Sequence, residues 1–543
     1  MLLTALPLLW PAVAPLTDLP GHLGRYRILA EAGQAPLAQH YAVHWALIGN
    51  LGVDGLVLAL APLAGLEPAT KLIVIAIPML MVAAMLWLAR EAHGRVPATA
   101  AFAFPIAYAA PFQLGFVNFS LAAALALAGL ALWLRLARRA SSPVRMVVFI
   151  PLSCLVWLCH SFGWVMLGLF IFGAEWALRR EAGASLARAS LKAALFCLPM
   201  ALPALAMIAA GGDRLAGGTG AWFDVPLKLF WAMSLLRERW QVYDVLSAAA
   251  LFLLLAVAWR SRPFSFAPVL AVPALLGGLA FLILPAFYAG ASCVDMRILP
   301  EAVALGLLAL RVTPGDDRFA GRLAGLGSLF FGMRLATTTL AFALFAQDQQ
   351  ATLRAIDAFP QGAAVLVLVN EPAFDNWHNP RLSHIAGIAV ERRRVFTNEQ
   401  WALPGQQLVR PLHPSAAPYD RDPSQLVYPP TVAGGTDFDR AITGFDRGVF
   451  GYVWTIGFPK GRAHAGDLVP VWSDEHSAVY QVETMPPKDP PGVERQSSGR
   501  YMFRNWAQRR GSGQSAPLNP RSVSGPPVAS PSARSRSSRR GRA

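Results

Sequence analysis

Apolar blocks of about 15–25 residues alternate with short polar segments over most of this chain. A helix rises about 1.5 Å per residue, so such a block can cross a hydrocarbon core of about 30 Å. The first block is Leu2–Leu16. Ten more lie at 71–89, 97–111, 116–134, 146–159, 163–178, 193–211, 245–259, 267–290, 297–311 and 323–346. The pattern predicts a mostly α-helical membrane protein with about eleven transmembrane helices.

The first block is short for a membrane span, at about 22 Å as a helix. The small residues "AVA" at 12–14 resemble a signal-peptide cleavage site, but no basic residue precedes Arg25. We therefore predict a first transmembrane helix here rather than a cleaved signal peptide.

Positively charged residues lie in alternate loops. If the N-terminus is inside, the inner loops hold Arg90, Arg95, Arg135, Arg138, Arg139, Arg145, Arg179, Arg180, Arg188, Lys192, Arg260, Arg262, Arg311, Arg318 and Arg322. The short outer loops at 112–115 and 160–162 hold no Lys or Arg. Cytoplasmic loops carry the excess of Lys and Arg, so this orientation is the predicted one. It places segment 17–70 outside, as a long first outer loop.

Two regions depart from the pattern of long blocks. Segment 17–70 includes "LGVDGLVLALAPLAGL", which predicts amphipathic helices lying on the membrane, or alternatively a further pair of spans. After the transmembrane region 1–346, short apolar runs separated by turn residues predict a small extracytoplasmic α/β or α+β domain at 347–488. Its strand candidates are "AAVLVLVN", "IAGIAVERRRVF", "FGYVWTIGF" and "SAVYQVE".

Composition agrees with a membrane protein, since 55% of the residues are hydrophobic and 15% are charged, against about 25% charged in soluble proteins. The net charge of +15 does not indicate nucleic-acid binding, because the excess lies in the short loops and in the last fifty or so residues. Residues 489–543 form a predicted disordered basic tail, which either contacts anionic lipid or glycan or has no specific partner. The four cysteines show no zinc-ligand spacing.

Asp18 is the first acidic residue of the chain and closely follows the first block. A carboxylate at this depth can act as a general base, or it can cap an interfacial helix. His22 follows one helical turn later and either orients Asp18, binds phosphate or lies exposed in a loop. Arg25 and Arg27 are expected to contact lipid phosphates.

Other polar residues occur inside or beside apolar blocks. Asp295 and Arg297 lie at the outer mouth of a block, where Arg297 either anchors the interface or binds phosphate. Arg334 lies within a block, where a charge costs about 2.5–3.5 kcal/mol at the bilayer centre, so it pairs with an acid or phosphate or marks a misplaced boundary. Asn118 and His160 are candidates for a polar lining, or are satisfied core partners. His378 and His384 are expected in a polar loop, because they lack a metal-ligand spacing.

Four segments resemble the GT-C superfamily of membrane glycosyltransferases, and uncharacterised bacterial members in particular. They are "TDLPGHLGR", "PFQLGFVNFSLAAALALAGLALWLRL", "HSFGWVML" and "LSHIAGIAVERRRVFTNEQWALPGQQLV". The resemblance covers roughly residues 10–485. The chain has Asp18-Leu19-Pro20 where the mannosyltransferase type has paired Asp-Glu, which leaves substrate class and metal use open.

The resemblance implies an enzyme of the bacterial inner membrane that moves a sugar from a polyprenyl-phosphate carrier to an envelope glycan, lipid or protein. It implies Asp18 as the general base. The expected substrate-binding residues are His22, Asn118, His160, Asp295, Arg297 and Arg334. No metal ligands are assigned, although a divalent metal remains possible. The alternatives are a transporter or flippase for a lipid-linked glycan and a non-catalytic envelope assembly protein.

Overall fold

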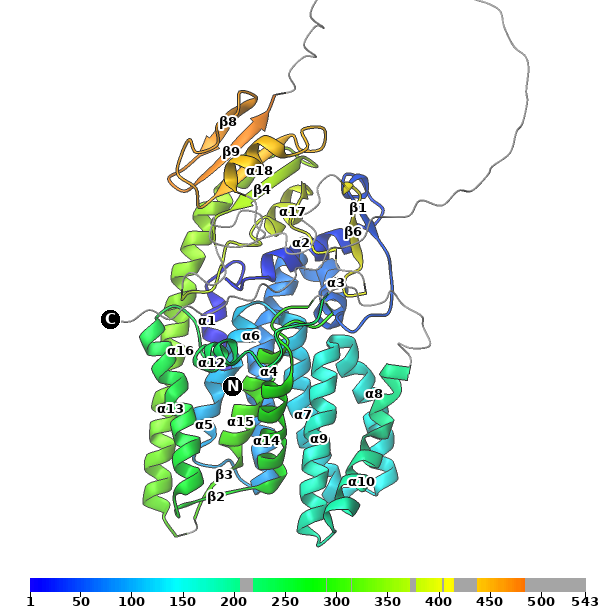
Figure 1. Ribbon diagram of the computed structural model, residues 1–543, viewed down its shortest axis with the longest axis vertical. Coiled ribbons are helices and arrows are strands. Elements are labelled where there is room, and N and C mark those ends of the chain that lie inside the picture. The colour runs from blue at the N-terminus through cyan, green and yellow to red at the C-terminus, as the bar shows by residue number, and fades with distance from the viewer. Residues whose placement is uncertain are drawn as a thin grey trace, which may run out of the picture. The chain divides into compact units, whose positions relative to one another are not determined.

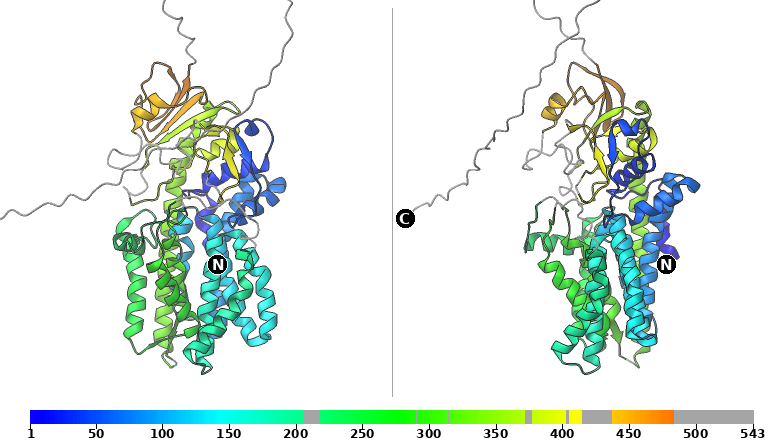
Figure 2. Two further views of the ribbon diagram at one scale, coloured as in Figure 1. Left: turned by 45° about the vertical axis from the view of Figure 1, so that its right-hand side comes forward. Right: turned by 90° about the vertical axis from the view of Figure 1, so that its right-hand side faces the viewer.

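Long apolar helices run alongside one another, and a five-stranded sheet lies beyond one end of them (Figures 1 and 2). Residues 1–485 form one compact unit in this computed structural model. The structure describes residues 1–205, 218–289, 291–313, 315–371, 377–402, 405–414 and 437–483. The predicted tail at 489–543 lies outside the described residues.

Seven helices in the described residues are long and apolar enough to cross a membrane. They are α4 (Leu66–His93), α7 (Val117–Arg139), α8 (Ser142–Cys159), α9 (Ser161–Glu181), α10 (Leu186–Cys197, extended through η4, Leu198–Ala201), α13 (Gln241–Arg260) and α16 (Asp317–Leu353). A mostly helical membrane protein is therefore confirmed, whereas the predicted number of spans is not.

Several predicted spans form shorter helical pieces. Block 97–111 is divided into α5 (Ala100–Ala103), η3 (Phe104–Tyr108) and α6 (Ala110–Gln113), and two later blocks give α14 (Pro268–Ile283) and α15 (Leu299–Ala309). The predicted first transmembrane helix at Leu2–Leu16 is wrong for the described chain. Only η1 (Leu2–Ala5) and α1 (Leu6–Leu9) are helical there. Three prolines within nine residues, at 7, 11 and 15, remove backbone donors and prevent one continuous helix.

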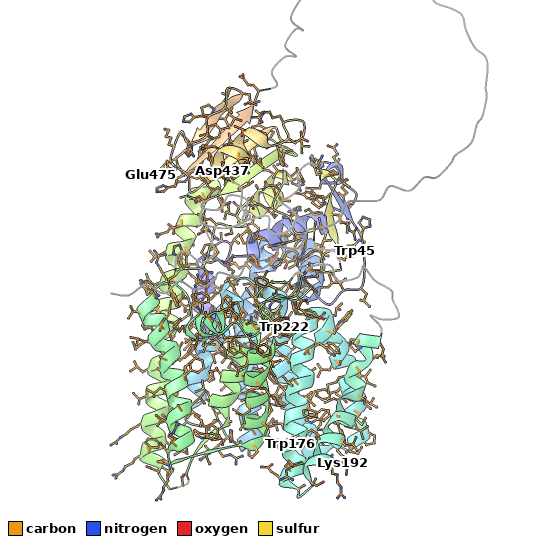
Figure 3. The ribbon with its side chains drawn as sticks, in the orientation of Figure 1. Trp45, Trp176, Lys192, Trp222, Asp437 and Glu475 are labelled. Carbon is orange, nitrogen blue, oxygen red and sulfur yellow. The ribbon has the colours of Figure 1, made fainter. Side chains whose placement is uncertain are left out.

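The basic loops predicted to be inside lie at the end of the helices opposite the sheet. Helices α4, α7 and α9 end there, and the antiparallel ribbon of β2 (Phe264–Phe266) and β3 (Leu310–Val312) lies at the same end (Figure 1). Figure 3 places Trp176 and Lys192 at this end and Trp222 toward the other. The charge pattern therefore identifies one common side of the helices.

The sheet has strand order β5-β4-β7-β9-β8. Strand β4 (Ala364–Val369) pairs in parallel with β5 (Phe396–Thr397) and β7 (Tyr452–Ile456), while β9 (Ser477–Val482) pairs antiparallel with β7 and β8 (Leu468–Ser473). Three predicted strands are confirmed as β4, β7 and β9. The fourth is wrong, because most of "IAGIAVERRRVF" forms helix α17 (Gly387–Arg393) before the two residues of β5. Every residue from Ile385 to Val390 is buried, so the segment shows neither the alternation of a half-buried strand nor a single exposed face.

Helix α2 (Leu19–Ala30) packs closely against α17. A Cβ on Gly387 would lie 2.0 Å from the carbonyl oxygen of Pro20, so only glycine permits this approach. The prediction that helices of segment 17–70 lie on the membrane is therefore wrong for α2, which is buried. Helix α3 (Gly52–Ala64) does expose an apolar face, with Leu56, Leu60 and Leu63.

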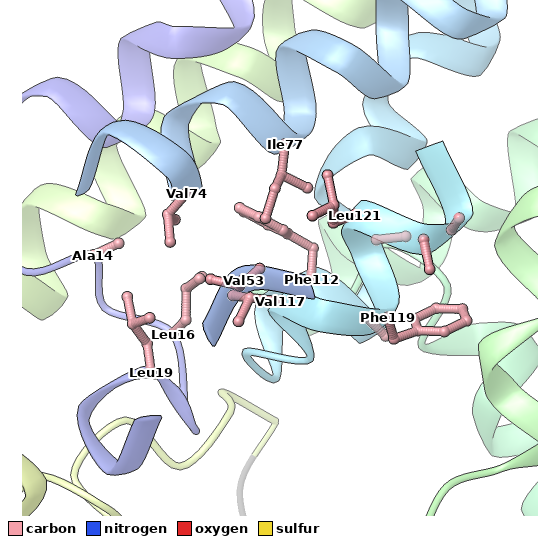
Figure 4. Packing of buried hydrophobic residues seen from close by; sticks show 14 of the residues in the cluster. Ala14, Leu16, Leu19, Val53, Val74, Ile77, Phe112, Val117, Phe119 and Leu121 are labelled. Carbon is pink, nitrogen blue, oxygen red and sulfur yellow. The ribbon is translucent and has the colours of Figure 1, made fainter. Parts of the chain in front are cut away.

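The remaining elements are short. They are η2 (Leu37–Gln39), β1 (Tyr41–Val43), β6 (Val409–Pro411), α12 (Val225–Met233), η5 (Asp295–Arg297), η6 (Arg354–Ala358) and α18 (Phe438–Gly444). Strands β1 and β6 form an antiparallel pair, which joins the first outer loop to the segment after α17. Leu16, Leu19, Val53 and Val117 lie together in one buried cluster beside the start of α2 (Figure 4). This packing fixes the position at which α2 begins.

We expect the sheet to lie outside the cell. In a variant without the four native cysteines, Ser473→Cys should react with a membrane-impermeant maleimide in intact spheroplasts, because Ser473 is exposed in β8. The matched variant Lys192→Cys, exposed near the opposite end of the helices, should react only after lysis. The reverse labelling pattern would show that the orientation predicted from the loops is inverted.

Candidate active site

Asp18 lies at the N-cap position of α2, directly above the apolar cluster. Its backbone N–H donates to the carbonyl of Leu114 (3.0 Å), and its side chain is 19% exposed. No described backbone N–H of α2 donates to the carboxylate, so the capping alternative finds no support. Instead, Oδ1 lies 3.7 Å from Nε2 of His384. The carboxylate is thus partly accessible and lies beside an imidazole.

Gly115 allows the backbone to pass Asp18 closely. Its φ is +86°, and an added Cβ would lie 2.7 Å from the Asp18 nitrogen. Both the positive φ and the short approach favour glycine. The segment between α6 and α7 therefore sets the position of Asp18.

Two histidines and a tryptophan line one side of Asp18. The rings of His22 and His384 lie 5.3 Å and 4.4 Å from the Trp401 ring. Burial, followed by the charge of Arg25, holds the pKa of His22 well below its usual value. His22 is therefore neutral near pH 7, which weakens a phosphate-binding role and leaves a packing role beside Asp18.

Arg297 and His160 lie together near Asp18. Nη1 of Arg297 is 3.2 Å from Nε2 of His160, and its guanidinium centre lies 4.3 Å from the Phe116 ring. Desolvation, opposed by the charges of Cys293 and Asp18, lowers the pKa of Arg297 from its very high usual value. Among the described residues, no carboxylate lies within ion-pair distance of this guanidinium, which donates to the carbonyls of Cys293 and Ser292.

The proton positions in this pair follow from the hydrogen bonds. Nδ1 of His160 accepts the N–H of Phe162 (3.0 Å), so the neutral ring carries its proton on Nε2. Burial and Arg297 hold the pKa of His160 well below its usual value, which keeps the ring neutral. Arg297 and His160 then present two N–H donors to the same half-buried space. An oxyanion placed there would accept from both.

Asn118 has a different environment. Its amide donates to the carbonyl of Asn50 (3.0 Å) and to Asp54 Oδ2 (2.8 Å), and its oxygen accepts from Val53 N (2.6 Å). Asp54 also pairs with Arg25 at 2.8 Å. Asn118 is therefore a satisfied partner that joins α3 to α7, and the expected contact of Arg25 with lipid phosphate is wrong, because Arg25 is buried.

Asp295 and Arg334 are also satisfied within the protein. Asp295 is buried and pairs with Lys228 at 2.6 Å. Arg334 pairs with Asp244 at 2.7 Å and donates to the carbonyl of Leu236. Since α16 has 37 residues and begins at Asp317, Arg334 lies about 26 Å along a helix that rises about 55 Å, close to its middle. The predicted site residues thus separate into Asp18, His22, His160 and Arg297 at one place, and three buried structural residues.

Sequence reasoning missed two residues beside Asp18. His384 was expected in a polar loop, but it is buried, and Trp401 covers it. Their sequence signal was weak, because His384 precedes and Trp401 follows α17, the helix that was predicted as a strand. The described residues contain no group of three or more His, Cys, Asp or Glu side chains placed to hold a metal ion.

Comparisons with known proteins give a structural similarity only. No protein-family model and no curated protein matches the chain. Two crystal structures of ArnT from Cupriavidus metallidurans, one bound to undecaprenyl phosphate and one apo, match with TM-scores of 0.46 and 0.45. Each is 14% identical and covers 88% of this chain and 95% of its own. Matches at this level assign no family, residue or substrate to this chain.

We expect Asp54→Ala to destabilise the protein. Removing one member of a buried pair leaves the other charge buried, which typically costs about 3–5 kcal/mol, and Asn118 also loses a partner. Thermal unfolding in detergent measures this effect. The matched change Asp357→Ala removes a partner of Arg393 that is 86% exposed, so it should cost less than about 1 kcal/mol. Equal effects would show that the Arg25–Asp54 pair is not a structural brace.

Proposed function

We propose that this chain is a membrane glycosyltransferase that takes a sugar from a polyprenyl-phosphate carrier, with Asp18 as general base. The observation that supports it most is the pair formed by Arg297 Nη1 and His160 Nε2, which has no carboxylate partner among the described residues and lies near the partly accessible carboxylate of Asp18. The two N–H donors suit a phosphate, and the carboxylate suits the proton of a hydroxyl group. The sequence resemblance to the GT-C superfamily points in the same direction.

In the proposed reaction, the carboxylate of Asp18 accepts the proton of an acceptor hydroxyl. The acceptor oxygen bonds to the anomeric carbon of the sugar, and the bond from that carbon to the phosphate oxygen breaks. The electron pair of the broken bond leaves with the phosphate. Arg297 and Nε2–H of His160 stabilise the additional charge, because they are already directed toward it.

The position of the site relative to the helices suits a lipid-linked donor. Helix α2, which begins directly after Asp18, lies between the apolar helices and the sheet (Figure 1). A carrier with its tail in the membrane would present its phosphate at this height. We place the acceptor among envelope glycans, lipids or proteins, and the reaction at the outer face of a bacterial inner membrane.

A transporter or flippase for a lipid-linked glycan is the alternative. It would use the donors of Arg297 and His160 to hold the phosphate and would need no base. A non-catalytic assembly protein would need neither group. The role of Asp18 therefore separates the proposed enzyme from both alternatives.

We expect Asp18→Asn to lower turnover by about 10²–10⁴-fold, the usual value of general-base assistance. Asparagine has nearly the same shape but cannot accept the hydroxyl proton, so donor binding should change little. The measurement is transfer from a polyprenyl-phosphate sugar in vitro, with thermal stability recorded in parallel.

Asp437→Asn is the matched control, because Asp437 caps α18 in the sheet layer by accepting from Arg440 N at 2.8 Å. It should leave turnover unchanged. If a stable Asp18→Asn protein turns over within a few-fold of the unaltered protein, Asp18 is not the base, and the transporter alternative gains.

We expect Arg297→Ala to raise the donor concentration needed for half-maximal transfer by about 10- to 100-fold. A hydrogen bond to a charged group contributes about 1.5–3 kcal/mol, and 1.4 kcal/mol corresponds to tenfold in binding. Arg297→Lys keeps the charge but loses the planar fork, so its effect should be smaller. Arg462→Ala, which removes an exposed ion pair with Asp439 in the sheet layer, is the control. Unchanged donor dependence in Arg297→Ala would make this residue an interface anchor.

A further inference from the structure

Apart from the candidate active site, a pocket of about 400 Å³ lies where the segment before α17 meets the outer ends of α13 and α16. Its lining holds two arginines, Arg239 and Arg381, two acids, Asp348 and Glu371, and the rings of Trp240, Phe345 and His378. None of these residues takes part in the proposed reaction, so that reaction does not explain the pocket.

Arg239 is the most available cation of this pocket. It is half-buried, and its guanidinium centre lies 4.8 Å from the ring of Phe345. Within the described part of the chain, no carboxylate lies within ion-pair distance of it. A stacked guanidinium with free N–H donors is well suited to bind a phosphate. Arg25 and Arg334, in contrast, are both held by acids.

Arginines lie around the pocket, because Arg239 and Arg381 line it and Arg237 acts on His378, while Asp348 is an acid of the same lining. Burial and then the charges of Arg239, Arg381 and Arg237 lower the pKa of His378, which Asp348 opposes. Glu371 is the other acid of the lining, but burial raises its pKa to about 7. This carboxyl is therefore only partly charged near neutral pH, and an entering anion meets little repulsion from it.

Arg381 connects this pocket to the active site. Its Nη1 donates to the carbonyl of Gln113 (2.8 Å), and the same carbonyl accepts from Thr17 N, the residue before Asp18. Three residues after Arg381, His384 lies beside Asp18. Three residues span at most about 10 Å. One short segment of the chain therefore carries both a residue of the pocket lining and a neighbour of Asp18.

We infer that this pocket holds the phosphate of an anionic lipid that serves as the acceptor, while its reacting hydroxyl lies at Asp18. This inference rests on the proposed function, because only a transferase has an acceptor. A lipid is favoured because the pocket lies at the outer ends of two apolar helices, with Trp240 and Phe345 in its wall. Arg297 and His160 then hold the donor phosphate, so the two phosphates occupy different sites.

Binding in detergent, measured by native mass spectrometry, tests the pocket without requiring activity. The probe is phosphatidic acid, with diacylglycerol as the uncharged lipid and inorganic phosphate as the competitor. The unaltered protein should bind phosphatidic acid more tightly than diacylglycerol, and Arg239→Ala should weaken this binding by about 10-fold or more. Arg239→Lys should retain part of it. Arg462→Ala and Asp18→Asn should bind as the unaltered protein does.

Unchanged binding in Arg239→Ala, or no preference over diacylglycerol, would overturn the pocket. If inorganic phosphate competes equally well at the same concentration, the pocket binds a free oxyanion rather than a lipid.

The acceptor role is tested by transfer into a membrane-lipid extract. Arg239→Ala should raise the amount of extract needed for half-maximal transfer by about 10-fold while the saturating rate stays near that of the unaltered protein. If Asp18→Asn keeps full turnover while Arg239→Ala loses lipid binding, Asp18 is not the base but the pocket does bind an anionic lipid. If Arg239→Ala leaves the dependence on extract unchanged, the bound lipid is not the acceptor.

Discussion

The contact between α2 and α17 is the constraint on which the candidate site depends. Asp18 lies near the N-terminus, whereas His384 and Trp401 come more than 360 residues later, and no local preference of the backbone brings them together. The missing side chain of Gly387 allows its backbone to lie against Pro20, and Gly24 allows the next turn of α2 to approach the same helix. A methyl group at either position would separate the two helices, and with them the carboxylate and the imidazole.

The structural residues and the proposed binding residues differ in how their buried charge is balanced. Arg25–Asp54, Lys228–Asp295 and Arg334–Asp244 are compact pairs, in which each charge offsets the desolvation of the other. Leaving one charge of such a pair alone costs several kcal/mol. Arg297 and Arg239 lack a carboxylate partner among the described residues but remain half-buried. Partial contact with water lowers the cost of keeping them, and an anionic substrate would supply the missing partner.

The sequence predicted the membrane class, the long helices and the basic side of the helices, because those features depend on local composition and on the length of apolar blocks. It also predicted β4, β7 and β9 from short apolar runs. It failed where tertiary packing decides. "IAGIAVERRRVF" has residues that suit a strand, yet most of it forms α17, which is buried and packs against α2. Asp18 and Arg297 were found because charge beside an apolar block is conspicuous. His384 and Arg239 were not, because their surroundings come from distant segments.

The length of α16 sets the height of both sites relative to the membrane. Its 37 residues rise about 55 Å, whereas a hydrocarbon core is about 30 Å thick. If the helix spans the core near its beginning, its last turns stand well beyond the surface. There Phe345 forms a wall of the anion pocket, and Gln349 donates to the carbonyl of Arg381 (3.5 Å). Arg381 in turn donates to the carbonyl of Gln113, beside the start of α2. One continuous helix thus supports the segment that carries Arg381 and His384, so the positions of the proposed base and of the proposed anion pocket relative to the helices follow from a single rigid element.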